Sequence, residues 1–422
     1  MPFLKPAHRR WVIVAIIFGA MVLNYIDRVT LSFLEKEIKT LFGLNNTGYA
    51  WVANIFIFFY AVMYPVSGWL VDRFGRGDGV RRMMFGGIVV WSAACIGAAF
   101  TRVAWTFGVC RALLGAAEPM AYAAQLRVVT EWFPKKLRAT ANSLCVAGGT
   151  IGMVVAAPLL VGLKENFDWR AAFLVPGVLG LAAGALWLVF YRNPPPEVLA
   201  ENTGAASTAH EPAFTWPQLW KTRTLWGVIL VRFISDPVWY FCLFWLPGYL
   251  KTAGLSERQV GLFGWIPFLF AAAGGIASGI VSDRMVRRGM APLRARKLML
   301  TAAAVLMPVF AFTPHLANPS LVIAIFSLVC AICLSWLFTV PVMMTETFPT
   351  RNVSGVLGIA AGCGAFGSVL FNLFVGRHLD NANPAAIFTV MAGLHLLASA
   401  VLWTMTRKET PRAARTPSPS LP

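Results

Sequence analysis

Six ionisable side chains interrupt the long apolar runs of this sequence, three acidic and three basic. They are Asp27, Arg28, Arg111, Glu118, Arg232 and Asp236. If the runs cross a membrane, an isolated charge near its centre costs about 2.5–3.5 kcal/mol, so six unpaired charges would cost roughly 15–20 kcal/mol. The balance of signs indicates that these groups offset that cost by pairing with one another or with a ligand.

Helix spacing limits which of these charges can meet. Arg111 and Glu118 are seven residues apart, so they share one face of a helix, about 10 Å apart along its axis. Asp27 and Arg28 are adjacent and point about 100° apart, so they face different neighbours. Arg28 therefore needs a partner from another helix or from a ligand.

Arg232 and Asp236 have the i, i+4 spacing at which two helical side chains touch. They can satisfy each other's charge without any other group. A purely structural pair and a functional pair both remain open for them.

The residue types indicate anion binding and proton binding. A guanidinium is always charged and grips a carboxylate with two hydrogen bonds, which makes Arg28 the first candidate ligand for an organic acid and Arg111 the second. A buried carboxylate gains affinity for a proton and loses it when an arginine pairs with it. Asp27 and Glu118 are therefore the candidate proton-coupling residues. Four of the five histidines lie in expected termini or loops and His395 lies in the last apolar run, so none is expected to carry the proton.

Composition and run length indicate an all-α polytopic membrane protein. The 422 residues are 58% hydrophobic and 13% charged, whereas a soluble domain is about 25% charged. The apolar runs are each close to the ~20 residues that a helix needs to cross a ~30 Å hydrocarbon core. The twelve expected spans are 11–34, 49–70, 83–101, 105–126, 139–163, 170–191, 224–250, 259–282, 297–313, 319–342, 353–376 and 385–406.

The net charge of +18 follows from the orientation of these spans. With both termini in the cytoplasm, 25 of the 36 Lys and Arg residues lie on the inner side, 8 on the outer side and 3 within spans. Positive residues gather on the cytoplasmic side of membrane proteins. The excess of positive charge therefore needs no nucleic-acid partner, and we expect a multi-pass membrane protein with both termini in the cytoplasm.

Two sequence markers repeat at nearly the same offset. The stretch "GWLVDR" (68–73) resembles "GIVSDR" (279–284), and "TEWFPKKLRATA" (130–141) resembles "TETFPTRNVSGV" (345–356). We expect two pseudo-symmetric six-helix halves, an architecture in which secondary transporters place the substrate site between the repeats. The expected parts are an N-terminal bundle at 1–191, a Pro-, Ala- and polar-rich cytoplasmic linker at 192–222, a C-terminal bundle at 223–406 and a disordered cytoplasmic tail at 407–422.

Charged residues at the inner ends of the repeated spans are candidates for gating. A carboxylate or a guanidinium there can contact a helix terminus of the other half and release it when the halves move. The residues expected to form this latch are Asp72, Arg73, Arg76, Asp283 and Arg284.

Several stretches resemble a known family. The loop "GWLVDRFGR…RR" resembles the signature of the major facilitator superfamily, with "GDGV" inserted between its basic residues. The stretches "NYIDR", "RALLGAAEP" and "RFISDPVWYFCLFWLPGYL" resemble its anion:cation symporter family, and the last is most similar to bacterial hexuronate transporters. The resemblance implies that the first, fourth, seventh and tenth spans line a central cavity, and that the protein lies in the bacterial inner membrane.

A sugar acid also needs hydrogen-bonding side chains for its hydroxyl groups. The candidates are Tyr25, Tyr60, Ser335, Trp336 and Asn372, of which Tyr60 is supported by the resemblance. Gluconate-type relatives bring a polar amide from the fifth span, where this chain has "VAGGTIG" with Gly149 and Thr150. That departure favours a bulkier cyclic uronate over an aldonate.

The sequence thus predicts proton-coupled symport of an organic anion, a hexuronate such as galacturonate or glucuronate, by alternating access. Substrate would compete with Glu118 and Asp27 for an arginine, and the released carboxylates would take up protons. The alternative substrates are an aldonate, glucarate, an aromatic acid or a dicarboxylic acid. The alternative functions are those of an anion exchanger, a sodium-driven carrier or a sensor without transport.

No pattern indicates a catalytic set, a cofactor or a metal site. The seven cysteines lack disulfide or metal spacing, and no nucleophile–base constellation supports a membrane enzyme. We expect a monomer whose partners are the substrate anion, protons and lipid.

Overall fold

The computed structural model describes residues 6–75, 77–203 and 214–407 of the chain. Three predictions lie wholly or partly outside these ranges: the gating residue Arg76, the middle of the linker and the tail beyond residue 407. The described ranges contain helices and no strand.

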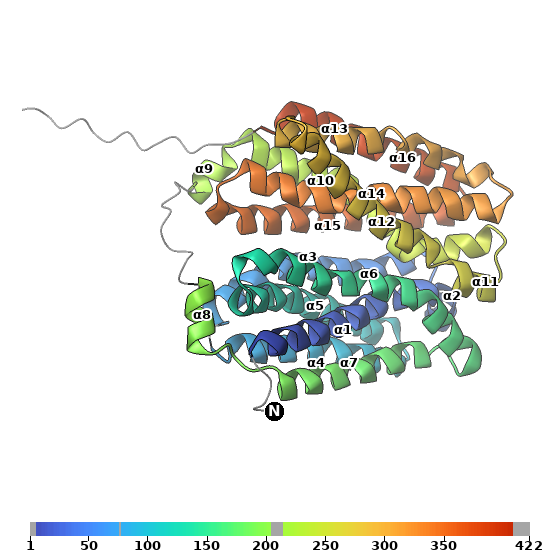
Figure 1. Ribbon diagram of the computed structural model, residues 1–422. Coiled ribbons are helices and arrows are strands. Elements are labelled where there is room, and N and C mark those ends of the chain that lie inside the picture. Colours follow the sequence, from blue (N-terminus) through green and yellow to red (C-terminus); the bar gives the residue numbers. More distant parts are fainter. Residues whose placement is uncertain (1–5, 76, 204–213, 408–422) are drawn as a thin grey trace, which may run out of the picture.

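Six long helices form the N-terminal half, the lower group in Figure 1. They are α1 (Pro6–Phe33), α3 (Asn46–Phe74), α4 (Gly79–Ala99), α5 (Ala104–Trp132), α6 (Lys135–Asn166) and α7 (Ala171–Phe190). The short α2 (Glu35–Phe42) follows α1. In the segment expected as a linker, the structure has two short helices, α8 (Pro196–Thr203) and α9 (Trp216–Trp220).

The C-terminal half repeats this arrangement above the first (Figure 1). It contains α10 (Arg223–Thr252), α11 (Glu257–Phe263), α12 (Ile266–Arg287), α13 (Pro292–Ala304), η2 (Met307–His315), α14 (Pro319–Thr347), α15 (Thr350–Asp380) and α16 (Pro384–Met405). The ninth expected span is divided into the α-helix α13 and the 3₁₀ helix η2. Pro308, which lacks an amide hydrogen, lies at the start of η2 and favours this change.

Eleven helical segments of the described chain are long and apolar enough to cross a membrane. Helix α5 is not among them, although it has 29 residues and packs against α3 and α4 as the fourth span. Its buried Arg111, Glu118 and Gln125 lower its hydropathy. With α5 included, the structure confirms the predicted all-α fold of twelve spans in two halves.

Helices α1 and α6 approach each other closely because α6 carries two glycines on the shared face. A Cβ atom on Gly148 would lie 2.4 Å from the carbonyl oxygen of Phe18, and one on Gly152 would lie 2.4 Å from that of Val22. Small residues spaced by four allow such backbone contact between spans. This packing fixes α1, which carries Asp27 and Arg28, against its neighbour.

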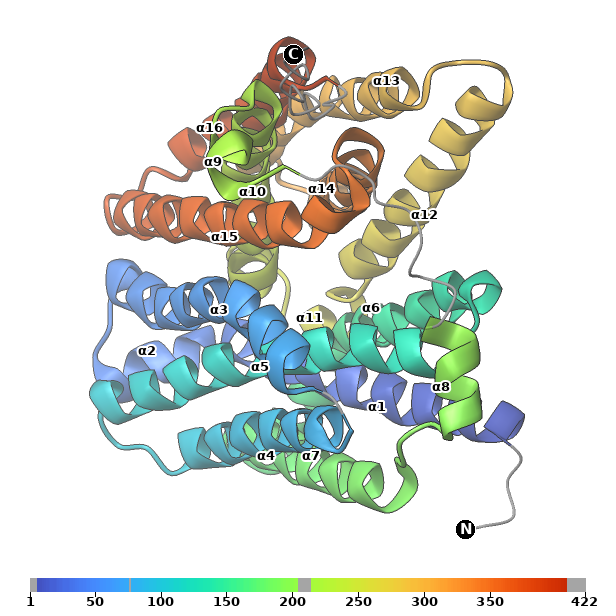
Figure 2. The same cartoon turned by 90° about the vertical axis from the view of Figure 1, so that its left-hand side faces the viewer.

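The two halves meet along α3 and α15, and along α6 with α11 and α12. We call the end of the bundle where α1 begins and α16 ends the terminal face. The opposite end, with α2 and α11 at the right of Figure 1, is the distal face. Figure 2 looks onto the terminal face and shows α3 lying beside α15.

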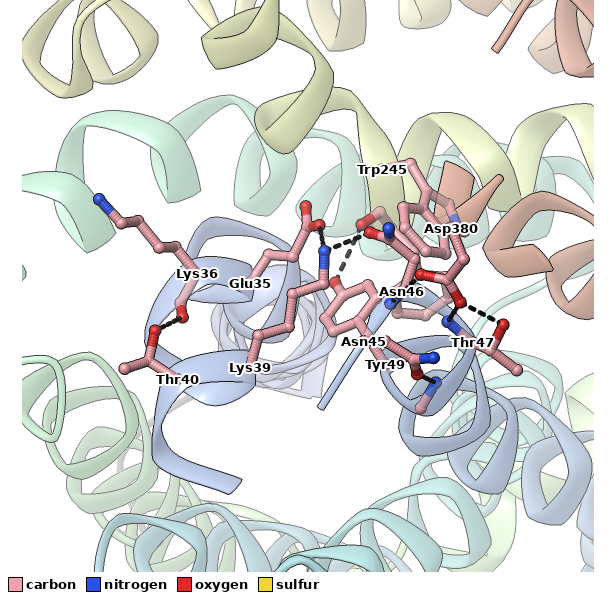
Figure 3. Close-up of polar contacts among 12 residues, drawn as sticks. Glu35, Lys36, Lys39, Thr40, Asn45, Asn46, Thr47, Tyr49, Trp245 and Asp380 are labelled. Atoms are coloured by element: carbon pink, nitrogen blue, oxygen red, sulfur yellow. Dashed lines mark hydrogen bonds and ion pairs between the residues drawn. The ribbon is translucent and has the colours of Figure 1, made fainter. Parts of the chain in front are cut away.

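At the distal face, a carboxylate of one half caps a helix of the other (Figure 3). The side chain of Asp380, at the end of α15, accepts hydrogen bonds from the amides of Asn46 (2.8 Å) and Thr47 (3.0 Å) and from the Thr47 hydroxyl (2.6 Å). The first amides of a helix have no partner within the helix and carry partial positive charge. The cap therefore joins the C-terminal half to the start of α3.

Ion pairs link the halves a second time at this face. Lys164 of α6 lies 2.6 Å from Glu37 of α2 and 2.9 Å from Glu257 of α11, and Lys251 of α10 lies 2.9 Å from Glu257. Lys39 contacts Glu35 and Asn46 beside a pocket of about 230 Å³ that both halves line (Figure 3). None of these contacts was predicted from the sequence.

We expect Asp380→Ala to open the distal face more often. A carboxylate that caps helix amides contributes about 1 kcal/mol, so the open population should rise roughly fivefold. The measurement is the modification rate of a cysteine introduced at Ala50, which is buried near Gly376 of α15, by a maleimide that does not cross membranes. Asp168→Ala is the control, because Asp168 pairs with the exposed Arg170 in the loop before α7. An unchanged modification rate would contradict the role of the cap.

Candidate functional site

The centre of the candidate site is an ion pair between α1 and α5. Nη2 of Arg28 lies 2.5 Å from Oε2 of Glu118, and Nε donates to the same oxygen at 3.0 Å. A weaker contact of 3.4 Å joins Nη2 to Asn24. Both charged side chains are buried, Arg28 at 7% and Glu118 at 2% exposure. Within the described chain, Oε1 of Glu118 has no hydrogen-bond partner, so the pair leaves half of the carboxylate unused.

Aromatic rings surround the guanidinium of Arg28. Its Cζ lies 4.4 Å from the ring centroid of Tyr25, 4.7 Å from that of Tyr60 and 5.6 Å from that of Phe56. Such cation–π contacts hold a guanidinium in place while leaving its hydrogen-bond donors free for an anion. The structure thus brings together three of the predicted binding and coupling residues with Arg28.

Gly149 of α6 makes room for this arrangement. A Cβ atom at Gly149 would lie 2.5 Å from Cε2 of Tyr25. The position of the Tyr25 ring therefore requires a glycine at residue 149. The fifth span supplies space at this point, and α1 supplies the side chain.

Three tyrosines that were not singled out from the sequence extend the site. The ring centroids of Tyr60 and Tyr64 are 5.8 Å apart, and those of Tyr64 and Tyr122 are 5.8 Å apart with stacked planes. Tyr240 of α10 lies close enough to Arg28 and Tyr60 to interact electrostatically with both. Tyr64, Tyr122 and Tyr240 each follow a candidate site residue by four positions, and this spacing could have identified them.

The guanidinium of Arg111, like that of Arg28, lies against the Phe56 ring. Its Cζ is 4.7 Å from the centroid of that ring, and the residue is 1% exposed. In the part of the chain that the structure describes, its Nε and Nη2 atoms find no hydrogen-bond acceptor. Arg111 therefore remains a buried cation with donors available to a ligand, separated from Glu118 although both lie on α5.

Asp27 contacts a different neighbour from Arg28, as the angle between adjacent helical residues predicts. Its Oδ1 lies 3.2 Å from Sγ of Cys95 on α4, and Cys95 also contacts the carbonyl oxygen of Phe173 on α7 at 3.3 Å. Asp27 is 1% exposed, and its Oδ2 has no partner among the described residues. The two predicted proton-coupling carboxylates therefore occupy different environments, and only Glu118 touches Arg28.

Ser335 and Trp336 are used in packing within the C-terminal half. The Ser335 hydroxyl donates to the carbonyl oxygens of Ala331 (2.7 Å) and Gly274 (3.0 Å). The Trp336 ring lies edge-on to His395, with centroids 5.3 Å apart. The contacts of these two residues do not include the Arg28 cluster, and their role in substrate binding stays a prediction.

Asn372 joins the halves on the distal side of the site. It accepts a hydrogen bond from Nε1 of Trp245 at 2.5 Å and donates to Oδ1 of Asn54 at 2.9 Å. Tyr49, in the same region, donates to the carbonyl oxygen of Phe244 at 3.0 Å. This placement makes Asn372 part of the contact between halves; its predicted contact with substrate stays a prediction.

The predicted gating residues form no bridge between the halves within the described ranges. Asp72 and Arg73 are exposed at the end of α3, and Arg284 is exposed near the end of α12. Asp283 pairs with Arg296 of α13 at 2.6 Å, inside the C-terminal half. A latch role for these residues stays a prediction.

The described residues contain no group of three His, Cys, Asp or Glu side chains placed to hold a metal ion. The arrangement around Arg28 would allow one carboxylate to replace another on the same guanidinium. An incoming carboxylate can take the place of Glu118 on Arg28, while the tyrosine hydroxyls offer hydrogen bonds to a polyhydroxylated molecule.

Comparisons with known proteins agree with this picture. The family model described as Major Facilitator Superfamily matches residues 17–340. The hexuronate transporter of Escherichia coli strain K12 is 27% identical over 409 residues, covering 94% of each chain. The probable galactarate/D-glucarate transporter GudP of Bacillus subtilis strain 168 is 30% identical over 349 residues, covering 77% of this chain and 76% of that one.

Among solved structures, the inward open conformation of the xylose transporter XylE from Escherichia coli has the same fold. It superposes with a TM-score of 0.75 at 16% identity, covering 95% of this chain and 97% of that chain. The residues matched by the Major Facilitator Superfamily model make up more than half of the sequence. The helices fold as two six-helix halves. The chain belongs to the major facilitator superfamily.

Proposed function

We propose that this protein is a proton-coupled symporter of an organic anion, a hexuronate such as galacturonate or glucuronate, in the bacterial inner membrane. The observation that carries the proposal is the buried Arg28–Glu118 ion pair surrounded by tyrosines. The sugar-acid relatives support an anionic, polyhydroxylated substrate.

Substrate and proton are coupled through competition for one guanidinium. In the absence of substrate, Arg28 holds Glu118 in its charged form. A substrate carboxylate that binds Arg28 displaces Glu118, and the displaced carboxylate, now buried without a cation, takes up a proton. The site then carries the same charge as before. Arg111, which has unused donors among the described residues and also lies against the Phe56 ring, adds a second positive charge that attracts the anion.

We assign the orientation of the protein in the membrane from its charge distribution, and the closed side from the distal contacts. In the described chain, most of the Lys and Arg residues belong to the loops and helix ends at the terminal face, and we assign this face, with the start of α1 and the end of α16, to the cytoplasm. The distal face is then the outer face, and the Asp380 cap and the Lys164 ion pairs close it. Alternating access requires these contacts to break when the outer side opens.

We expect an inward proton gradient to drive accumulation of labelled glucuronate in proteoliposomes containing the wild-type protein. Glu118→Gln should lose gradient-driven accumulation but keep exchange of substrate across the membrane, because Arg28 still binds the carboxylate. Glu131→Gln is the matched control on the same helix, since Glu131 pairs with Arg127 near the end of α5. Accumulation that survives in Glu118→Gln would show that Glu118 does not couple the proton. Uptake indifferent to the gradient in the wild type would indicate an anion exchanger.

The affinity for substrate should also depend on pH with a defined sign. Binding releases Glu118 to take up a proton, so by linkage a proton strengthens binding and the dissociation constant falls as the pH falls from 8 to 5. One coupled proton changes the constant by at most ~10-fold per pH unit. Calorimetric titration of the purified protein measures this slope. A flat profile in the wild type would contradict the competition, and Glu118→Gln should make the profile flatter.

A further inference from the structure

The pocket at the distal face is formed by both halves of the protein. Helices α2 and α3 contribute Glu35, Lys39 and Asn46, and α10, α15 and α16 contribute the rest of the lining. Its volume is about 230 Å³, below the roughly 300–1,000 Å³ of pockets that take drug-sized ligands. An occupant is therefore a small molecule, and it can contact both halves only while the distal face is closed.

One oxygen of the Glu35 carboxylate is unused at this pocket. Oε1 accepts a hydrogen bond from Nζ of Lys39, whereas Oε2 is buried and has no hydrogen-bond partner within the described chain. Figure 3 shows this second oxygen directed away from Lys39. A Cβ atom on Gly248 of α10, which also lines the pocket, would lie 1.9 Å from Oε2, so the glycine makes room for the carboxylate. A ligand with an N–H donor would satisfy this acceptor.

Aromatic side chains form much of the remaining wall. The lining includes Phe241, Trp245, Tyr249 and Phe388. The ring centroid of Phe388 lies 4.8 Å from that of Tyr249 and 5.7 Å from that of Phe241. Nζ of Lys39 lies 5.9 Å from the centroid of Trp245, so an ammonium group already rests near one of these rings. Aromatic faces attract cations and recur in sites that recognise ammonium ligands.

The charges beside the pocket favour a cation over an anion. Asn46 accepts a hydrogen bond from Lys39 and donates its amide to Asp380, so Glu35, Lys39, Asn46 and Asp380 form one connected group (Figure 3). This group has two carboxylates and one ammonium, an excess of one negative charge. A positively charged ligand compensates that excess, whereas an anion adds to it.

We propose that the distal pocket binds a small organic ammonium ion and that the bound ion holds the distal face closed. The ammonium group donates a hydrogen bond to Oε2 of Glu35, and the apolar part of the ligand packs among the aromatic rings. The lining contains no residue of the Arg28 cluster, so this site is distinct from the proposed substrate site. A ligand that binds only the closed conformation lowers the ratio of open to closed protein.

The first test measures binding of three probes of similar shape and different charge to the purified full-length protein by calorimetry. The probes are 2-phenylethylammonium, 2-phenylethanol and phenylacetate. The alcohol should bind about 10- to 100-fold more weakly than the ammonium ion, because it lacks the charge-assisted hydrogen bond, and phenylacetate more weakly still. Equal affinity for the ammonium ion and the alcohol, tighter binding of phenylacetate, or no binding of the ammonium ion would each overturn the proposal.

Two variants locate the ligand. Glu35→Gln should weaken binding of 2-phenylethylammonium at least about 10-fold and leave the affinity for 2-phenylethanol nearly unchanged. Asp168→Asn is the matched control, because it removes a carboxylate from the exposed pair with Arg170. Thr252→Trp fills the pocket from an exposed lining position without touching the Glu35–Lys39 pair, and it should abolish binding of both probes. Binding of the ammonium ion that either pocket variant leaves unchanged would place the ligand elsewhere and overturn the proposal.

The effect on closure is measured with a cysteine introduced at Ala50 and a thiol-specific methanethiosulfonate reagent. With 2-phenylethylammonium at ten times its dissociation constant, the ratio of open to closed protein should fall about 10-fold, and modification should slow by the same factor. The Thr252→Trp protein with the same cysteine should show no slowing. Binding of the ammonium ion without slower modification would overturn its role in closure. None of these measurements uses a sugar acid, so their failure leaves the proposed function intact.

Discussion

The arrangement of the site depends on one constraint, the need of the buried Arg28 for a negative partner. Removing one partner of a buried ion pair costs roughly 3–5 kcal/mol, because the other charge is left without compensation. Glu118 provides that charge from α5, and the rings of Tyr25 and Tyr60 enclose the guanidinium. In the proposed mechanism, a negative ligand that replaces Glu118 meets the same constraint, so a single guanidinium serves both the empty and the loaded protein.

Glycines on the neighbouring helices allow the close packing that places these side chains around Arg28. Gly149 leaves the volume that the Tyr25 ring occupies, and Gly148 and Gly152 bring the α6 backbone against α1. On α5, Gly115 has no side chain because a Cβ atom there would lie 2.3 Å from the carbonyl oxygen of Phe56. The small residues and the charged residues are thus two parts of one arrangement, in which close helix packing places polar side chains where lipid cannot reach.

Much of the fold follows from hydropathy, and the site follows only in part. The charges within the spans were visible as interruptions of apolar runs, and the same charges keep α5 out of the eleven clearly apolar segments. The pairing of Arg28 with Glu118 depends on a contact between residues 90 positions apart, which spacing along one helix does not encode. The bonds from Asp380 to the amides of Asn46 and Thr47 are harder still to predict, because backbone donors leave no mark in a sequence.

The Asp380 cap has a consequence for the energy of opening. Its acceptor and donors lie at an exposed end of the bundle, so water can replace each bond as the two halves separate. The cap therefore contributes only a small free energy to the closed state, so it does not by itself trap the protein in one conformation. Charged contacts near the surface are also screened over about 8 Å at physiological ionic strength. The ionic strength of the medium at the distal face should therefore influence the lifetime of the closed conformation.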